Sequence, residues 1–132
     1  DNFSRRIFKD GGPAGRGRRI HKDGRDMKEL DKDTFDSAVL ESEGVTVVDF
    51  WSDGCEECVE MMPEYESLAA KYGDKARFAK VNIQGNRRLA IREKVMGLPS
   101  ILIYRDGTKE AAFSKEFEID EVESKLREIL RA

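Results

Sequence analysis

The chain has 132 residues, of which 39% are apolar, and this is enough for one modest hydrophobic core but not for two. No apolar run approaches the roughly 18 residues that a membrane-spanning helix needs, and no signal peptide is visible in a sequence that begins at Asp1 without a methionine. The only two cysteines, Cys55 and Cys58, would close almost no loop as a disulfide, which excludes a disulfide-stapled secreted scaffold and favours a catalytic or metal-binding pair in a reducing compartment.

Charge divides the chain into two regions. Residues 1–27 contain eight Lys or Arg against four Asp, a net charge of +4, which leaves −7 for the rest of the chain if the total is −3. This stretch also has five glycines and few apolar residues, so it cannot bury enough surface to offset the entropy lost on ordering. We therefore expect residues 1–26 to be a basic, glycine-rich, flexible extension and residues 27–132 to form the domain.

The basic segment GRGRRIHKDGR could contact nucleic acid or an anionic membrane surface through its charge. It contains no Phe, Tyr or Trp that could stack on a base. A solvated tail or linker, without specific binding of nucleic acid, is therefore the favoured interpretation. A remnant of a larger protein or of a membrane anchor stays open.

After the extension, the spacing of apolar residues alternates between strand and helix periods. We expect a short strand over 27–30, an amphipathic helix that begins at an N-cap, Asp33 or Thr34, and a strand over 45–51 that is covered on both faces.

The second half of the chain continues this alternation. The expected elements are a helix over 56–72, a strand over 77–83, a helix over 86–96, a hairpin over 100–113 that turns at Asp106-Gly107, and a C-terminal helix capped by Asp120 with Glu123 three residues on. The resulting order, βαβαβαββα, predicts an α/β fold: a central mixed sheet of about five strands flanked by helices on both faces.

The cysteine pair lies where a buried strand passes into a helix. Cys55 is at the helix start and Cys58 is one turn further in. The free amides and the dipole of a helix N-terminus favour an anion, which lowers the pKa of Cys55 and makes it the nucleophile, while Cys58 is less exposed and can resolve a mixed disulfide. Zinc within one chain is disfavoured because His21 is the only other candidate ligand; a metal or iron–sulfur site shared by two chains stays open.

With these residues in place, the sequence resembles the thioredoxin family over residues 27–132. The resemblance is carried, in order, by VDFW at 48–51, the Cys-x-x-Cys pair, Pro63 in the following helix, Lys80 in FAKVNI, GLPS at 97–100 and the DGT hairpin turn. Together these motifs imply the thioredoxin fold. They are far more specific than a lone Cys-x-x-Cys pair.

The resemblance implies a role for each matching residue. Cys55 would attack the substrate disulfide, Cys58 would resolve the intermediate, Asp49 would accept the proton of Cys58, and Lys80 would modulate Asp49. A carboxyl on a doubly covered strand should have a raised pKa, which suits such a base. The substrate-binding surface would comprise Trp51, Gly54, Gly97, Leu98 and Pro99, with a cis Leu98-Pro99 bond and the Leu98 backbone offered to a substrate strand.

By resemblance, the protein is expected to be a thiol–disulfide oxidoreductase that reduces protein disulfides through the redox-active pair Cys55–Cys58, without another cofactor and without a metal. Its expected partners are disulfide-containing proteins and a thioredoxin reductase or equivalent electron donor, with no specific nucleic acid and no membrane span. We expect a cytoplasmic monomer. A periplasmic or membrane-tethered location stays open if upstream sequence has been removed. Two other functions also stay open: a disulfide oxidase or isomerase, and a non-catalytic thioredoxin-like binding module.

The sequence departs from the family pattern at the rim of the site. Glu56 and Glu57 replace the usual Gly-Pro between the cysteines, and Gly54 replaces the usual tryptophan, as in a subgroup of thioredoxins from amino-acid-fermenting anaerobes. Lys115 stands near a position where the family often has glycine. Because a like charge disfavours a thiolate, we hypothesise that the two glutamates make the dithiol a stronger reductant. The alternative is that they point to solvent and have little effect.

Overall fold

The structure, a computed structural model, describes residues 27–132; the expected extension, residues 1–26, lies outside the described residues. The elements run in the order β2 (Lys28–Leu30), η1 (Asp36–Leu40), β3 (Val45–Trp51), α1 (Glu56–Tyr72), β4 (Arg77–Asn82), α2 (Arg87–Arg92), β5 (Ser100–Arg105), β6 (Thr108–Ser114) and α3 (Ile119–Arg131). Among these residues, every helix is too short or too polar to cross a membrane.

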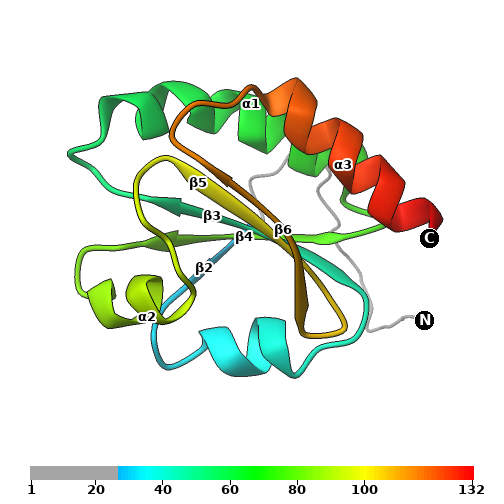
Figure 1. Ribbon diagram of the computed structural model, residues 1–132, viewed down its shortest axis with the longest axis horizontal. Helices are drawn as coiled ribbons and strands as arrows, with labels where there is room; N and C mark the ends of the chain where they lie inside the picture. Colours follow the sequence, from blue (N-terminus) through cyan, green and yellow to red (C-terminus); the bar gives the residue numbers. More distant parts are fainter. Residues whose placement is uncertain (1–26) are drawn as a thin grey trace, which may run out of the picture.

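One five-stranded sheet, in the order β2-β4-β3-β5-β6, organises the molecule. The strands β2, β4 and β3 are parallel, while β5 runs antiparallel to β3 and to β6. Figure 1 shows α1 and α3 on one face of this sheet and η1 and α2 on the other. The predicted mixed sheet with helices on both faces is therefore confirmed.

The central strand β3 is buried on both sides, as its continuous apolar sequence predicts. Successive side chains of a strand point to opposite faces, so Val45 and Val47 join the core under α1 and α3, whereas Val48 and Phe50 join the core under η1 and α2. By the same alternation, Asp49 and Trp51 point to the α1 side. The alternation of β3 thus puts a carboxyl group into the core beneath α1.

The first helical segment is shorter than predicted. Instead of a helix capped by Asp33 or Thr34, the structure has a five-residue π-helical turn, η1, preceded by Phe35. The Asp31 carboxylate accepts the backbone N–H groups of Asp33 and Thr34, at 2.9 and 3.0 Å. The predicted cap is wrong because Asp31 already satisfies the free amides at this end.

The start of α3 and the end of α2 also differ from the prediction. The N-cap of α3 is Glu118, and Asp120 lies in the first turn, where its charge complements the helix dipole. Helix α2 ends at Arg92 rather than near residue 96 because Lys94 adopts a positive φ of 66°. The Val95 N–H then reaches Ala90 O and the Lys94 N–H reaches Ile91 O, which is the hydrogen-bond pattern that terminates a helix.

Candidate active site

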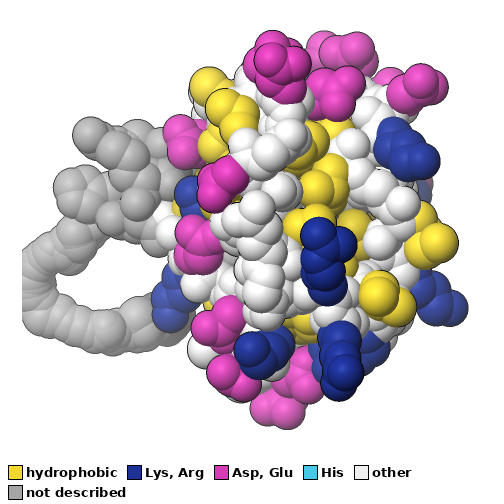
Figure 2. All heavy atoms as spheres, turned by 90° about the vertical axis from the view of Figure 1, so that its left-hand side faces the viewer, with side chains coloured by type: hydrophobic (Ala, Val, Ile, Leu, Met, Phe, Trp, Pro, Cys, Tyr) yellow, Lys and Arg dark blue, Asp and Glu magenta, His cyan; other side chains and the backbone are white. Residues whose placement is uncertain are grey.

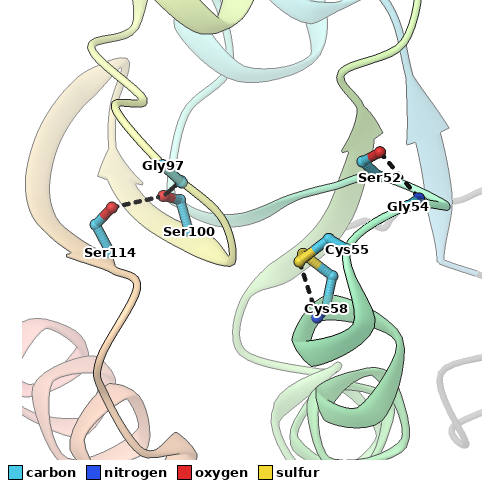
Figure 3. Close-up of a disulfide and its surroundings, with 7 residues drawn as sticks. All are labelled: Ser52, Gly54, Cys55, Cys58, Gly97, Ser100 and Ser114. Carbon is cyan, nitrogen blue, oxygen red and sulfur yellow. Dashed lines mark hydrogen bonds between the residues drawn. A yellow bond between two sulfur atoms is a disulfide. The ribbon is translucent and has the colours of Figure 1, made fainter.

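The dithiol lies at the N-terminus of α1, as predicted. Cys55 is the N-cap residue, and its Sγ accepts the backbone N–H of Cys58 at 3.1 Å. The two residues form a disulfide, with their Cα atoms 5.2 Å apart (Figure 3). Cys55 is partly exposed, whereas Cys58 is only 1% exposed. An incoming disulfide can therefore reach Cys55 but not Cys58, and an anion on Cys55 Sγ would lie against an amide donor and the positive end of the helix.

Asp49 is buried in the core beneath α1, with 4% of its surface exposed. Burial disfavours the charged carboxylate and raises the pKa of Asp49 to about 8, although the charge of Lys80 opposes this shift. Asp49 and Lys80 are directly paired in register between β3 and β4 and point to the same face. A carboxyl group with this pKa can exchange a proton near neutral pH, which the resemblance required of it.

Lys80 lies near both Asp49 and Trp51. Its ammonium group lies 5.6 Å from the centre of the Trp51 ring, within the range of a cation–π contact. The Trp51 indole is partly exposed, yet its Nε1 is buried and has no hydrogen-bond partner among residues 27–132. The structure thus brings Asp49, Lys80 and Trp51 together on one face of two neighbouring strands.

Tyr65 of α1 is packed close to this site, and it was not predicted as a site residue. Its ring is fully buried, and its hydroxyl donates to Ala79 O at 2.8 Å. A second acceptor, Val47 O, lies 3.1 Å from the same hydroxyl oxygen. Burial and the charge of Asp49 both raise the pKa of Tyr65. A tyrosine rather than another apolar residue at this helical spacing was the available signal, because a buried hydroxyl needs a partner.

The loop opposite the dithiol contains the predicted cis bond between Leu98 and Pro99. Ser100, 1% exposed, donates its hydroxyl to Gly97 O, and the Ser114 hydroxyl lies 3.0 Å from it (Figure 3). Because Ser100 uses its only proton on Gly97, Ser114 is the donor in the second bond. Ser100 occurs in the GLPS motif but was not predicted as a site residue. It ties residues 97–100 to β6.

The two glycines of the predicted substrate surface have different environments. A Cβ at Gly54 would meet only Ser52 Oγ, at 3.9 Å, so the backbone does not require a glycine there. A Cβ at Gly97 would collide with the side chain of Lys115, which lies across it. Lys115 has a positive φ of 68°, and its N–H donates to Pro99 O at 2.8 Å. Such a backbone conformation favours glycine, which explains the expectation of glycine near this position.

Glu56 and Glu57 are both exposed, in the first turn of α1. Their charges complement the helix dipole but lie in solvent, where they are screened. The hypothesis that they tune the thiolate is untested by this geometry. Among residues 27–132, no three His, Cys, Asp or Glu side chains converge as a metal site.

Comparison with known proteins gives one family. Residues 26–128 match the family model described as Thioredoxin. The chain is 51% identical to a thioredoxin of Acetoanaerobium sticklandii over 90 residues, which cover 68% of this chain and 86% of that protein. It is 49% identical to a thioredoxin of Peptoclostridium acidaminophilum, covering 68% and 82%, and 37% identical to one of Rhodospirillum rubrum, covering 61% and 78%.

Proposed function

The chain belongs to the thioredoxin family and is a thiol–disulfide oxidoreductase that reduces protein disulfides, and we propose that Cys55 and Cys58 act in turn with Asp49 as the base. The observation that carries this assignment is the position of the pair at the start of α1, with an accessible first sulfur and a buried second one. The redox-active pair itself carries the electrons.

In the first step, the Cys55 thiolate attacks one sulfur of the substrate disulfide. A bond forms between Cys55 Sγ and that sulfur, the substrate S–S bond breaks, and the second substrate sulfur leaves as a thiolate that takes a proton from solvent. The Cys58 N–H, which already points at Cys55 Sγ, stabilises the attacking thiolate. Residues Trp51, Gly54, Gly97, Leu98 and Pro99 form the surface on which the substrate rests.

In the second step, the ionised form of Asp49 takes the proton of Cys58, and the Cys58 thiolate attacks Cys55 Sγ. The mixed disulfide breaks, the first substrate sulfur leaves as a thiolate and is protonated, and Cys55–Cys58 becomes a disulfide. Two electrons have then moved from the dithiol to the substrate. The raised pKa of Asp49, about 8, supports this role, and the nearby charge of Lys80 keeps that pKa from rising further.

As a thioredoxin, the protein passes electrons from a reductase to disulfide-containing proteins. We further propose that the electron donor is a thioredoxin reductase or an equivalent, and that the protein works in the cytoplasm, where thiols are kept reduced. We also propose that it acts as a monomer and that residues 27–132 are its catalytic domain.

Reduction of insulin with dithiothreitol as electron donor tests the proposal. Cys55→Ser should abolish the catalysed rate, while Cys58→Ser should accumulate a mixed disulfide with the substrate, detectable by mass. Asp49→Asn should slow the decay of the mixed disulfide about tenfold or more at neutral pH, because Cys58 loses its base. Asp53→Asn, which removes an exposed carboxylate from the loop between β3 and α1, is the control.

Full activity of Cys55→Ser would contradict the assignment of the nucleophile. Equal decay of the mixed disulfide in Asp49→Asn and Asp53→Asn would contradict the assignment of the base. A measured redox potential in the range of oxidising rather than reducing dithiols would indicate an oxidase or isomerase instead.

A further inference from the structure

A groove of about 520 Å³ begins beside the dithiol and runs between α1 and the segment that leads into α3. At one end it is lined by Glu57, which lies between the two cysteines, and by Pro99 of the opposite loop. At the other end it reaches Glu64 and Glu118, which also line the next hollow along the two helices. The groove is therefore continuous with the surface on which the substrate disulfide must lie.

The charge of this groove is strongly one-sided. Its lining contains one lysine, Lys115, against six exposed glutamates: Glu57, Glu60, Glu64, Glu116, Glu118 and Glu121. Figure 2 shows acidic side chains gathered at the top of this end of the molecule, where α1 lies, next to an exposed hydrophobic area. None of the ion pairs found within residues 27–132 involves any of the six. Their charges are thus not neutralised by a cation of the described domain.

The base of the groove is apolar and its far end is defined by an ion pair. Met61, Phe117 and Pro99 line it and are partly or fully buried.

Beyond Glu64, the lining changes to Lys71, whose ammonium pairs with Glu123 at 2.6 Å. The unneutralised stretch of α1 runs from Glu57 to Glu64, about 10 Å at the rise of an α-helix, which is the length of roughly three residues of extended chain.

From these features we propose that the groove binds a lysine- or arginine-rich segment of the disulfide substrate, within about three residues of the cysteine that Cys55 attacks. The long stems of Lys and Arg suit a groove with an apolar base and acidic walls, because the stems can pack while the charged heads reach the carboxylates. The inference rests on the proposed function, since it makes the groove an extension of the dithiol site. Selection of basic substrates then results from charge complementarity next to the reacting sulfur.

The test uses three peptide disulfides that share one sequence except for the three residues on each side of the cysteine, which are all Lys, all Ser or all Glu. The reduced full-length protein is mixed with each peptide, and the second-order rate constant for peptide reduction is measured at low and at high salt. The groove variant is Glu60→Gln/Glu64→Gln/Glu121→Gln. The matched control is Glu41→Gln/Asp74→Asn/Glu110→Gln, which removes three exposed carboxylates that do not line the groove.

We expect the wild type to reduce the Lys peptide roughly threefold to tenfold faster than the Ser peptide at low salt, and the Glu peptide more slowly. In the groove variant the Lys-to-Ser ratio should fall toward one, whereas the control variant should retain it. High salt should reduce the wild-type ratio, because these charges are exposed.

A wild-type Lys-to-Ser ratio of one, or an equal fall in both triple variants, would overturn the groove as the source of selectivity while leaving the reductase function intact. Faster reduction of all three peptides by the groove variant alone would also overturn the proposal. That result would mean that the acidic groove of the wild type is already occupied, by other basic residues of this chain or by a second copy, and that the substitutions free it. Reduction of none of the peptides by the wild type would overturn the reductase function and the inference with it.

Discussion

At the scale of single residues, Asp49 has the largest consequence for both stability and chemistry. A carboxyl group in the core beneath α1 costs free energy whenever it is ionised, and its raised pKa measures that cost. In the proposed mechanism, the same property suits Asp49 to act as the base for Cys58. That role would account for a residue that an optimally stable protein would replace.

Asp49→Asn should stabilise the oxidised protein at alkaline pH. In the unfolded chain the carboxyl ionises near its ordinary pKa of 3.8, whereas in the folded protein it stays protonated until about pH 8. Between these values the folded state binds the extra proton, so the stability of the wild type falls as pH rises through this window and then levels off. Asn does not titrate. The advantage of Asp49→Asn in free energy of unfolding should therefore grow from near zero at about pH 4 to on the order of 5 kcal/mol at about pH 9.

Urea unfolding of the oxidised wild type and variant across this range measures the difference, with Asp53→Asn as the exposed control. An advantage that is the same at both ends of the range would show that the carboxyl is not the titrating group.

Tyr65 and Ser100 are buried polar residues that connect separate segments of the chain. Each is a buried hydroxyl whose single proton fixes the relation between two elements: Tyr65 joins α1 to β4, and Ser100 joins the start of β5 to residue 97. The two hydroxyls hold these segments of the chain in position.

At the scale of elements, the N-terminus of α1 combines opposing influences. The helix dipole and the Cys58 amide favour a thiolate on Cys55, whereas the charges of Glu56 and Glu57 disfavour it while stabilising the helix itself. Both glutamates are exposed, so their effect on the thiolate is expected to be modest.

The double variant Glu56→Gly/Glu57→Pro should lower the pKa of the Cys55 thiol by a few tenths of a unit to about one unit, because two nearby negative charges are removed. The redox potential should rise with it, since a more stable thiolate makes the dithiol a weaker reductant. Thiolate absorbance titrated against pH, at low and high salt, provides the measurement. High salt should shrink the difference between variant and wild type.

The control for this pair is Glu41→Gln/Asp74→Asn, which changes the net charge equally but away from the first turn of α1. A Cys55 pKa that is unchanged or higher in the Gly-Pro variant would show that the two glutamates only solubilise the helix start.

At the scale of the whole molecule, the sheet, the two layers of the hydrophobic core and the dithiol site are all built from residues 27–132. One layer packs β3 and β5 against α1 and α3, and the other packs the opposite side of the same strands against η1 and α2. A domain that buries both faces of its sheet with its own residues should fold by itself.

A chain of residues 27–132 alone should therefore have the same free energy of unfolding as the full chain, within about 1 kcal/mol, and the same rate of insulin reduction. Urea unfolding monitored by the fluorescence of Trp51, together with the insulin assay, makes the comparison. A loss of several kcal/mol would show that residues 1–26 are part of the folded domain.

Much of the fold and site follows from the sequence because the signals are local. The β-branched run of β3, the helical spacing of α1 and the Asp106-Gly107 turn each specify their element, and the structure has β3 and α1 at the predicted residues. Cys55 and Cys58 are three residues apart, so their placement on the first turn of α1 can be predicted once the start of the helix is known. The start of the first helical segment and the end of α2 were predicted wrongly. Asp31 accepts two backbone N–H groups and Lys94 adopts a positive φ, and several neighbouring residues could equally have filled these positions.

The sequence by itself thus determined the order of elements, the dithiol and the identity of the buried acid, since each depends on residues adjacent in the chain or on one strand's alternation. Only the tertiary structure decided what surrounds them. Ser100 binds Gly97 O and approaches Ser114, Lys115 lies across Gly97, and glutamates of α1 meet those preceding α3 in one groove. These contacts join segments far apart in the sequence, and no local periodicity encodes which of them meet when the sheet and helices pack.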